Sequence, residues 1–236
     1  MSESLPGPDA VPAAFTLAEL TAMVVISGYN PNFINPESFR QNGIVDGDWS
    51  LETPAETPAV VGGSQTSFHY TNGVTVWANP DYLVVTQKGD SLQVSEFRGH
   101  QVVSRYVEIA PANVFHAVGF NLEGNIRLPD GAGLSSPLDQ RLTLGDTQPA
   151  LEMRASYEQE GKELALFWTE HLRPSNQEDP HLSLRGIIRL PVPEASKERE
   201  SQQVFVKDVL AHRERHLRKF WSLIQQLADL YQLRGT

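Results

Sequence analysis

The histidine pair in the segment HRERH is the part of this sequence most like a metal site. His212 and His216 are four residues apart, so on a helix their side chains share a face, and imidazoles in this arrangement can bind Zn²⁺. The pair is surrounded by four cationic residues, Arg213, Arg215, Arg218 and Lys219. These charges repel a divalent ion and lower the pKa of an imidazole. We therefore predict no bound metal here and interpret the segment as a solvated basic face.

The other residue types that could perform catalysis form no recognised pattern. The sequence has no G-x-S-x-G motif for an activated serine, and no G-x-G-x-x-G or P-loop motif for a nucleotide. It has no cysteine, which excludes disulfides, a thiol nucleophile and thiolate metal ligands. Asp46 and Asp48 flank Gly47 as residues of a turn do. The sequence therefore favours a protein without catalytic activity and without a cofactor.

Two single histidines are interpreted as structural residues. His116 falls among apolar positions, which predicts a hydrogen-bonded histidine in the core. His171 follows Glu170 in an expected strand, where neighbouring side chains point to opposite faces, so the two are not expected to act as a pair.

The segment 68–97 alternates apolar and polar residues between turn signals and predicts a meander of four strands through about Phe97. Asn72-Gly73 predicts a two-residue type I′ turn, which would pair Phe68 with Trp77. Phe68, Tyr70 and Trp77 would then share one face of the sheet. Such an aromatic group could be a platform for a ligand or partner, or the core face of the sheet.

The elements that would position these residues alternate between strands and helices. We expect strands at 21–29, 113–129 and 181–192, a hairpin within 150–172, short helices at 35–43 and 102–110, and a long C-terminal helix from about Ser201. An apolar stripe marks that last helix, made by Val206, Leu210, Leu217, Phe220, Ile224, Leu227 and Tyr231. The opposite face would carry the candidate interaction residues His212, Arg215, His216, Arg218 and Lys219.

The predicted fold class is α+β, with antiparallel sheet meanders in two halves and a long C-terminal helix. Residues 1–14 are interpreted as a flexible leader, and the loop 130–137 as a boundary between halves at 15–130 and 138–236. The halves share a plan of strands followed by a helix without a visible sequence repeat. They could form one compact domain or two.

Charge is divided unevenly along the chain. Residues 1–196 hold 11 Lys and Arg against 24 Asp and Glu, a balance of −13, whereas residues 197–236 have a balance of +3. An acidic body repels phosphates, which speaks against extended contact with nucleic acid or an anionic membrane. The longest apolar run, Ala22 to Ile26, is far shorter than the roughly 20 residues of a membrane helix, and the N-terminus lacks a secretory pattern. We expect a cytoplasmic protein.

Three segments resemble a bacterial family described as sporadically distributed and of unknown function. They are GVTVWANPDYLVVTQ (73–87), VGFNLEGNIRLP (118–129) and VLAHRERHLRKFWSLI (209–224). The family has a strand meander, a Gly-aromatic-x-x-x-Asn strand ending in Pro, and a C-terminal helix with a His before a Phe; Asn125 lies one position beyond the family's usual Asn. The resemblance implies an α+β protein of two sheet-and-helix halves without known catalytic residues.

These observations favour a noncatalytic protein that works as an interaction or assembly component, with a protein partner or with a second copy of itself. Two other classes stay open. One is a small-molecule-binding protein or hydrolase with an unmarked site between the halves. The other is an acidic mimic of nucleic acid, or an inhibitor. It is suggested by the net charge of −13 over residues 1–196.

Overall fold

The computed structural model describes residues 15–52, 65–90, 92–110, 114–127, 153–159, 162–171, 181–194, 196 and 198–232. In strands β6 and β7, at Lys219 and at residues 230–232, the backbone is described but not the side chains. The expected leader 1–14 and the boundary loop 130–137 lie outside the described residues.

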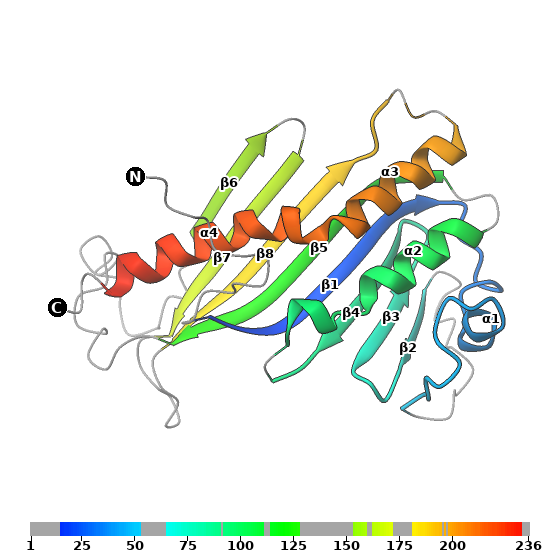
Figure 1. The fold of residues 1–236 in the computed structure, drawn as a ribbon, viewed down its shortest axis with the longest axis horizontal. Helices are drawn as coiled ribbons and strands as arrows, with labels where there is room; N and C mark the ends of the chain where they lie inside the picture. Colours follow the sequence, from blue (N-terminus) through cyan, green and yellow to red (C-terminus); the bar gives the residue numbers. More distant parts are fainter. Residues whose placement is uncertain are drawn as a thin grey trace.

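In the described part of the chain, eight strands form one antiparallel sheet in the order β2-β3-β4-β1-β5-β8-β7-β6 (Figure 1). The strands are β1 (Phe15–Ser27), β2 (Thr66–His69), β3 (Val74–Ala78), β4 (Tyr82–Lys88), β5 (Val114–Arg127), β6 (Met153–Gln159), β7 (Lys162–His171) and β8 (His181–Pro191). The helices are α1 (Pro36–Gln41), α2 (Gly99–Ile109), α3 (Arg199–Ala211) and α4 (Arg213–Gln232), with the 3₁₀ turn η2 (Val94–Glu96) before α2. The α+β fold class with antiparallel meanders is therefore confirmed, but the fourth strand expected before Phe97 was wrong, because that segment contains η2.

The two halves of the sheet have the same topology. In the first half, β1 to β4 are followed by α2, and the strand order is β2-β3-β4-β1. In the second half, β5 to β8 are followed by α3 and α4, and the order, read inwards from the other edge, is β6-β7-β8-β5. The first strands of the two halves, β1 and β5, pair antiparallel at the centre. The repeat of topology thus begins at β5.

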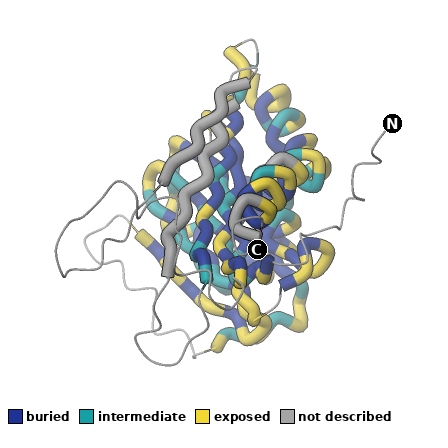
Figure 2. Tube along the Cα trace, turned by 90° about the vertical axis from the view of Figure 1, so that its left-hand side faces the viewer, coloured by how far each residue is buried: buried dark blue, intermediate teal, exposed yellow. Residues whose placement is uncertain are grey.

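Helices cover one face of the sheet. Figure 1 shows α2, α3 and α4 across the strands, and Figure 2, turned by 90°, shows helices to one side of them. A single apolar core lies between these helices and the sheet and includes residues of both halves, among them Leu20, Val85, Phe120, Ile188 and Phe220. Burial of this apolar area is the main contribution to stability.

Local sequence signals explain several element boundaries. Asn35 caps α1, since its side-chain oxygen accepts a hydrogen bond of 2.8 Å from the Ser38 N–H, and Pro36 occupies the first helical position. Gly43, with φ of +65°, follows the helix. The expected short helices, the hairpin of β6 and β7, and the strand β8 with Arg185 and Arg189 exposed are all confirmed.

The register predicted for the β2–β3 hairpin was wrong by one residue. Phe68 pairs with Val76, and Trp77 pairs with Ser67. The loop has three residues, because the Tyr70 N–H bonds to the Val74 carbonyl and Gly73 takes a φ of +79°. Asn-Gly fits a two-residue turn, but Gly also fits the closing position of a three-residue loop with a bulge. The sequence pattern alone did not distinguish the two-residue turn from the three-residue loop.

His116 is not in the core, contrary to expectation. The β1–β5 ladder shifts register between Val25 and Ile26, which pair with Ala117 and Phe115. This bulge turns Phe115 into the core and leaves His116 exposed. Its Nε2 lies 3.0 Å from the Ser27 hydroxyl, so the expected hydrogen bond is present at the surface instead.

The expected single C-terminal helix is two helices that meet at His212. The His212 Nδ1 lies 3.0 Å from the Asp208 carbonyl oxygen and 3.1 Å from the Asp208 carboxylate. Such local side-chain contacts compete with the regular helical bonds. The apolar stripe also has no member between Leu210 and Leu217. The stripe itself is confirmed from Val206 to Leu227, whose members are buried, while the side chain of Tyr231 lies outside the described part.

Candidate functional site

The described helices leave the second face of the sheet open (Figures 1 and 2). Side chains alternate across each strand, so the residues between the core positions point to this side. The strand register arranges them into rows that cross the sheet. We call this surface the open face.

The central row of the open face is apolar. Trp77 of β3 pairs with Val84 of β4, and Val84 pairs with Met23 of β1. All three side chains are half-buried. Beside this row Tyr82, also half-buried, pairs with Val25. The open face therefore has an aromatic and aliphatic centre that is partly accessible.

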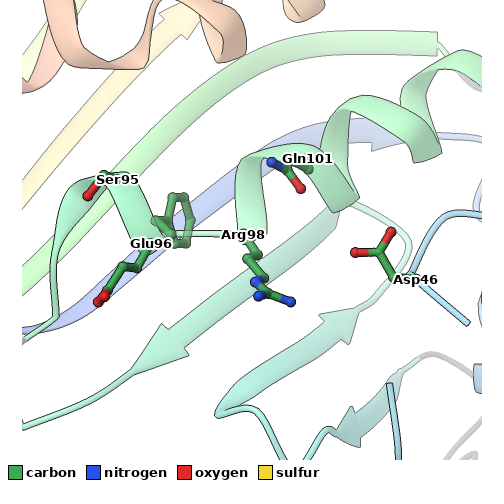
Figure 3. Close-up of a pocket in the computed structure, with 6 residues that line it drawn as sticks. Asp46, Ser95, Glu96, Arg98 and Gln101 are labelled. Carbon is green, nitrogen blue, oxygen red and sulfur yellow. The ribbon is translucent and has the colours of Figure 1, made fainter. Parts of the chain in front are cut away.

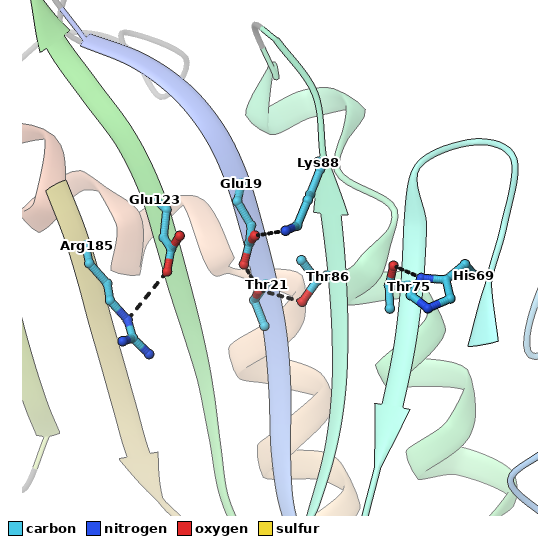
Figure 4. Close-up of polar contacts among 8 residues, drawn as sticks. All are labelled: Glu19, Thr21, His69, Thr75, Thr86, Lys88, Glu123 and Arg185. Carbon is cyan, nitrogen blue, oxygen red and sulfur yellow. Dashed lines mark hydrogen bonds and ion pairs between the residues drawn. The ribbon is translucent and has the colours of Figure 1, made fainter. Parts of the chain in front are cut away.

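The next row is made of hydroxyl and imidazole groups (Figure 4). The Thr21 and Thr86 hydroxyls lie 2.9 Å apart, and the His69 Nδ1 lies 2.9 Å from the Thr75 hydroxyl. Asn121, paired with Thr21, has a buried Oδ1 without a hydrogen-bond partner. These groups are bonded mainly to each other along the sheet, so they form a polar border of the apolar centre.

A third row is charged (Figure 4). The Lys88 ammonium lies 3.0 Å from the Glu19 carboxylate, and the Arg185 guanidinium lies 3.6 Å from the Glu123 carboxylate. The hydrogen bond and charge of Glu19 raise the pKa of Lys88. Arg127 and Arg189 are also exposed on this face. Among the described side chains, the open face thus has four cationic groups and two carboxylates, although the whole chain has a net charge of −10.

The aromatic trio expected from the sequence does not form one face. Phe68 and Tyr70 are 5% and 3% exposed on the helix side, where Phe68 packs edge-on against Phe39. Burial raises the pKa of Tyr70, whose hydroxyl has no hydrogen-bond partner. Trp77 lies on the open face because the hairpin register differs by one residue. Phe68 and Tyr70 are thus core residues, which agrees with the interpretation of the aromatic group as the core face of the sheet and not with a platform for a ligand.

The expected basic face is also divided. His212, Arg215 and Arg218 are exposed, and the side chain of Lys219 lies outside the described part. His216 is turned inward instead, with its ring stacked on Phe120 at a centroid distance of 6.5 Å. Phe120 belongs to the core side of β5, so His216 lies on the sheet-facing side of α4.

The sequence did not mark two other residues, Arg213 on the same helix as His216 and His100 on α2, as candidate binding residues. The Arg213 side chain is only 13% exposed, and its Nε is buried without a hydrogen-bond partner. His100, in the first turn of α2, also has a buried Nδ1 without one. Burial lowers the pKa of His100 to about 4; the charge of Arg213 adds to this, and a backbone hydrogen bond with Phe97 opposes it. A single inward arginine on a mostly basic segment gave no distinguishing signal in the sequence.

A hollow lies at the start of α2, and Figure 3 shows the residues that line it. It has a volume of about 390 Å³ and is lined by Asp46, Ser95, Glu96, Phe97, Arg98 and Gln101. Its Asp46 carboxylate is already bound to Arg105 at 2.7 Å, and Phe97 is buried. The remaining lining is exposed and of mixed charge, so this hollow is a weaker candidate than the open face.

The described residues contain no group of three or more His, Asp or Glu side chains placed to hold a metal ion. Within the same residues, none of the helices combines the length and apolarity required to cross a bilayer.

Comparisons with protein-family models, with curated proteins and with solved structures found no match for this chain. The family resemblance drawn from the three short segments therefore stays a prediction. The function is inferred below from the arrangement of the residues in the structure.

Proposed function

We propose that this protein is a noncatalytic interaction component that binds a protein partner on the open face of its sheet. The observation that carries the proposal is the row of Trp77, Val84 and Met23, which is half-buried on a face that no described helix covers. Trp, Tyr and Met are enriched at the centres of protein interfaces, where they contribute large contact areas.

The surroundings of this row support a protein rather than a small molecule as the occupant. Small-molecule sites are concave, whereas the row extends over three adjacent strands and has a polar border on one side. An apolar centre with a polar rim is the usual anatomy of a protein interface.

The charges of the open face indicate the chemistry of the partner. Lys88, Arg127, Arg185 and Arg189 outnumber Glu19 and Glu123 among its described side chains. The matching partner is therefore a protein surface with apolar side chains and carboxylates. A second copy is one protein that could supply carboxylates, since the chain as a whole is acidic.

The test compares one change on the open face with a matched change elsewhere. Met23→Arg places a charge in the apolar row, and Val204→Arg places the same charge on α3, where Val204 is 69% exposed. Light scattering measures self-association, and capture from a lysate with purified wild-type and variant proteins measures binding of another protein.

The proposal requires that a complex, with a second copy or with another protein, is weakened by Met23→Arg and kept by Val204→Arg. It is overturned if every complex survives Met23→Arg in a folded protein, or if the protein is monomeric and captures nothing. Circular dichroism and thermal unfolding show whether each variant is folded, and Trp77→Ala provides a second change in the same row.

A further inference from the structure

Arg213 is an unusual side chain in this fold. It begins α4, is 13% exposed, and its buried Nε–H has no acceptor among the described residues. Among the described residues, the nearest carboxylate oxygen belongs to the adjacent Glu214, 3.8 Å from an Arg213 nitrogen, which is too long for a hydrogen bond. A covered guanidinium is usually paired, because leaving a buried charged donor unsatisfied is costly. The arrangement therefore calls for an acceptor with negative charge.

His100 adds a second buried polar atom, from the other half of the protein. Its ring lies beside Phe97 at a centroid distance of 5.8 Å, and its buried Nδ1 has no hydrogen-bond partner. The charge of Arg213 contributes, after burial, to lowering the pKa of His100, so the two side chains lie within electrostatic range of each other. His100 belongs to α2 of the first half and Arg213 to α4 of the second, so the two groups come from different halves of the protein.

His216 completes the cluster. It is three residues after Arg213 and so lies on a neighbouring part of the same helix face. The stacking of its ring on Phe120 fixes it against the sheet. We call Arg213, His100 and His216 the cluster; His100 lies beside the ring of Phe97, and His216 is stacked on the ring of Phe120.

The chemistry of this cluster selects an anion. Arg213 repels a metal cation, whereas a guanidinium N–H donates strongly to phosphate and carboxylate oxygens. An imidazole can add a second donor, and becomes a better one when a neighbouring anion favours its protonated form.

We propose that the cluster of Arg213, His100 and His216 binds a small oxyanion, the phosphate or carboxylate group of a ligand, between the two halves of the protein. This site is separate from the open face, which lies on the other side of the sheet. It would make the protein a ligand-responsive interaction component, because an anion bridging α2 and α4 joins helices of both halves.

The experiment titrates inorganic phosphate, and acetate in parallel, into the full-length protein at constant ionic strength set with NaCl. The NMR signals of the histidine rings report the site directly, and thermal unfolding reports stabilisation by binding. Arg213→Gln removes the positive charge, whereas Arg213→Lys keeps the charge but lacks the planar guanidinium group. Arg218→Gln is the matched control at an exposed position on the same helix.

We expect saturable shifts of the His100 and His216 ring signals and a rise in melting temperature in the wild-type protein and in Arg218→Gln. Arg213→Gln should bind about tenfold or more weakly, as loss of a charged hydrogen bond implies, and Arg213→Lys should be intermediate. The relative effects of phosphate and acetate identify the type of anion.

The proposal is overturned if neither anion moves the His100 and His216 signals beyond the NaCl control, or if Arg213→Gln and Arg218→Gln respond alike. If Arg213→Gln does not fold, the wild-type titration and Arg213→Lys still decide the question.

Discussion

Gly186 of β8 leaves the space that the ring of Phe220 fills: a Cβ at position 186 would lie 2.8 Å from that ring. This contact is where α4 approaches the second half of the sheet. Because both Phe220 and Leu122, at 3.0 Å, are in the packed core, neither can move away freely.

Gly186→Ala should therefore lower the free energy of unfolding by about 1–3 kcal/mol, the usual cost of overpacking a core. Chemical denaturation measures the change. Gly47→Ala is the control, because a Cβ there meets nothing within 4 Å. Equal stability of the two variants would show that α4 does not pack closely on β8.

Gly73→Val should destabilise the β2–β3 hairpin by about 1 kcal/mol or more. Gly73 has a φ of +79°, which a β-branched residue adopts only with strain, and its Cβ would lie 3.0 Å from the Lys88 carbonyl oxygen. Thermal unfolding compares it with Gly89→Val, where the nearest atom to a Cβ is 3.9 Å away and φ is not positive. An unchanged melting temperature in Gly73→Val would contradict the glycine-closed loop.

Stability should fall as the pH decreases from about 7 to about 4, in part because of His100. Its pKa is about 4 in the folded protein, against an ordinary value of 6.5, so the unfolded chain binds the proton first and is favoured within this window. Urea denaturation at several pH values should give a shallower pH dependence for His100→Gln than for the wild-type protein.

The exposed His69→Gln serves as the control for this titration, since carboxylates also titrate at the acid end. The same pH profile for His100→Gln and His69→Gln would contradict the prediction. An ordinary pKa for His100 in an NMR titration would also contradict it.

Charge reversal on the outer side of α4 tests a second assembly surface. Arg215 and Arg218 are exposed in a protein of net charge −10, so they could contact the acidic surface of another copy. Replacing Arg215, Arg218 and Lys219 by Glu should then reduce the mass of any assembly at low salt, as high salt should for the unmodified protein. If light scattering gives the same mass under all these conditions, these residues form a solvated surface and not an assembly contact.

The local elements could be predicted because their signals are short-range. The Asn35 cap with Pro36, the stripe from Val206 to Leu227 and the alternation of β8 depend on neighbours in sequence, and all three are confirmed. The face on which Trp77 lies depends on a one-residue difference in loop length, which Asn72-Gly73 does not determine. His116 was misplaced for a similar reason, since its bulge is set by pairing with a distant strand.

The candidate sites depend even more on distant pairing. The row of Trp77, Val84 and Met23 joins residues from three strands, and only the sheet order shows that they are adjacent. Arg213 and His100 are more than a hundred residues apart, and nothing near either of them in the sequence indicates the other.

The central pairing of β1 with β5 also limits how the chain can be divided. Their ladder extends from Phe15 and Ile126 at one end to Ser27 and Val114 at the other, nearly the full length of both strands. A fragment containing only one repeat would present that long, largely apolar edge to solvent, and exposed edges of this kind recruit further strands. We infer that separate expression of the halves favours aggregation, and that the duplicated topology is a single cooperative folding unit.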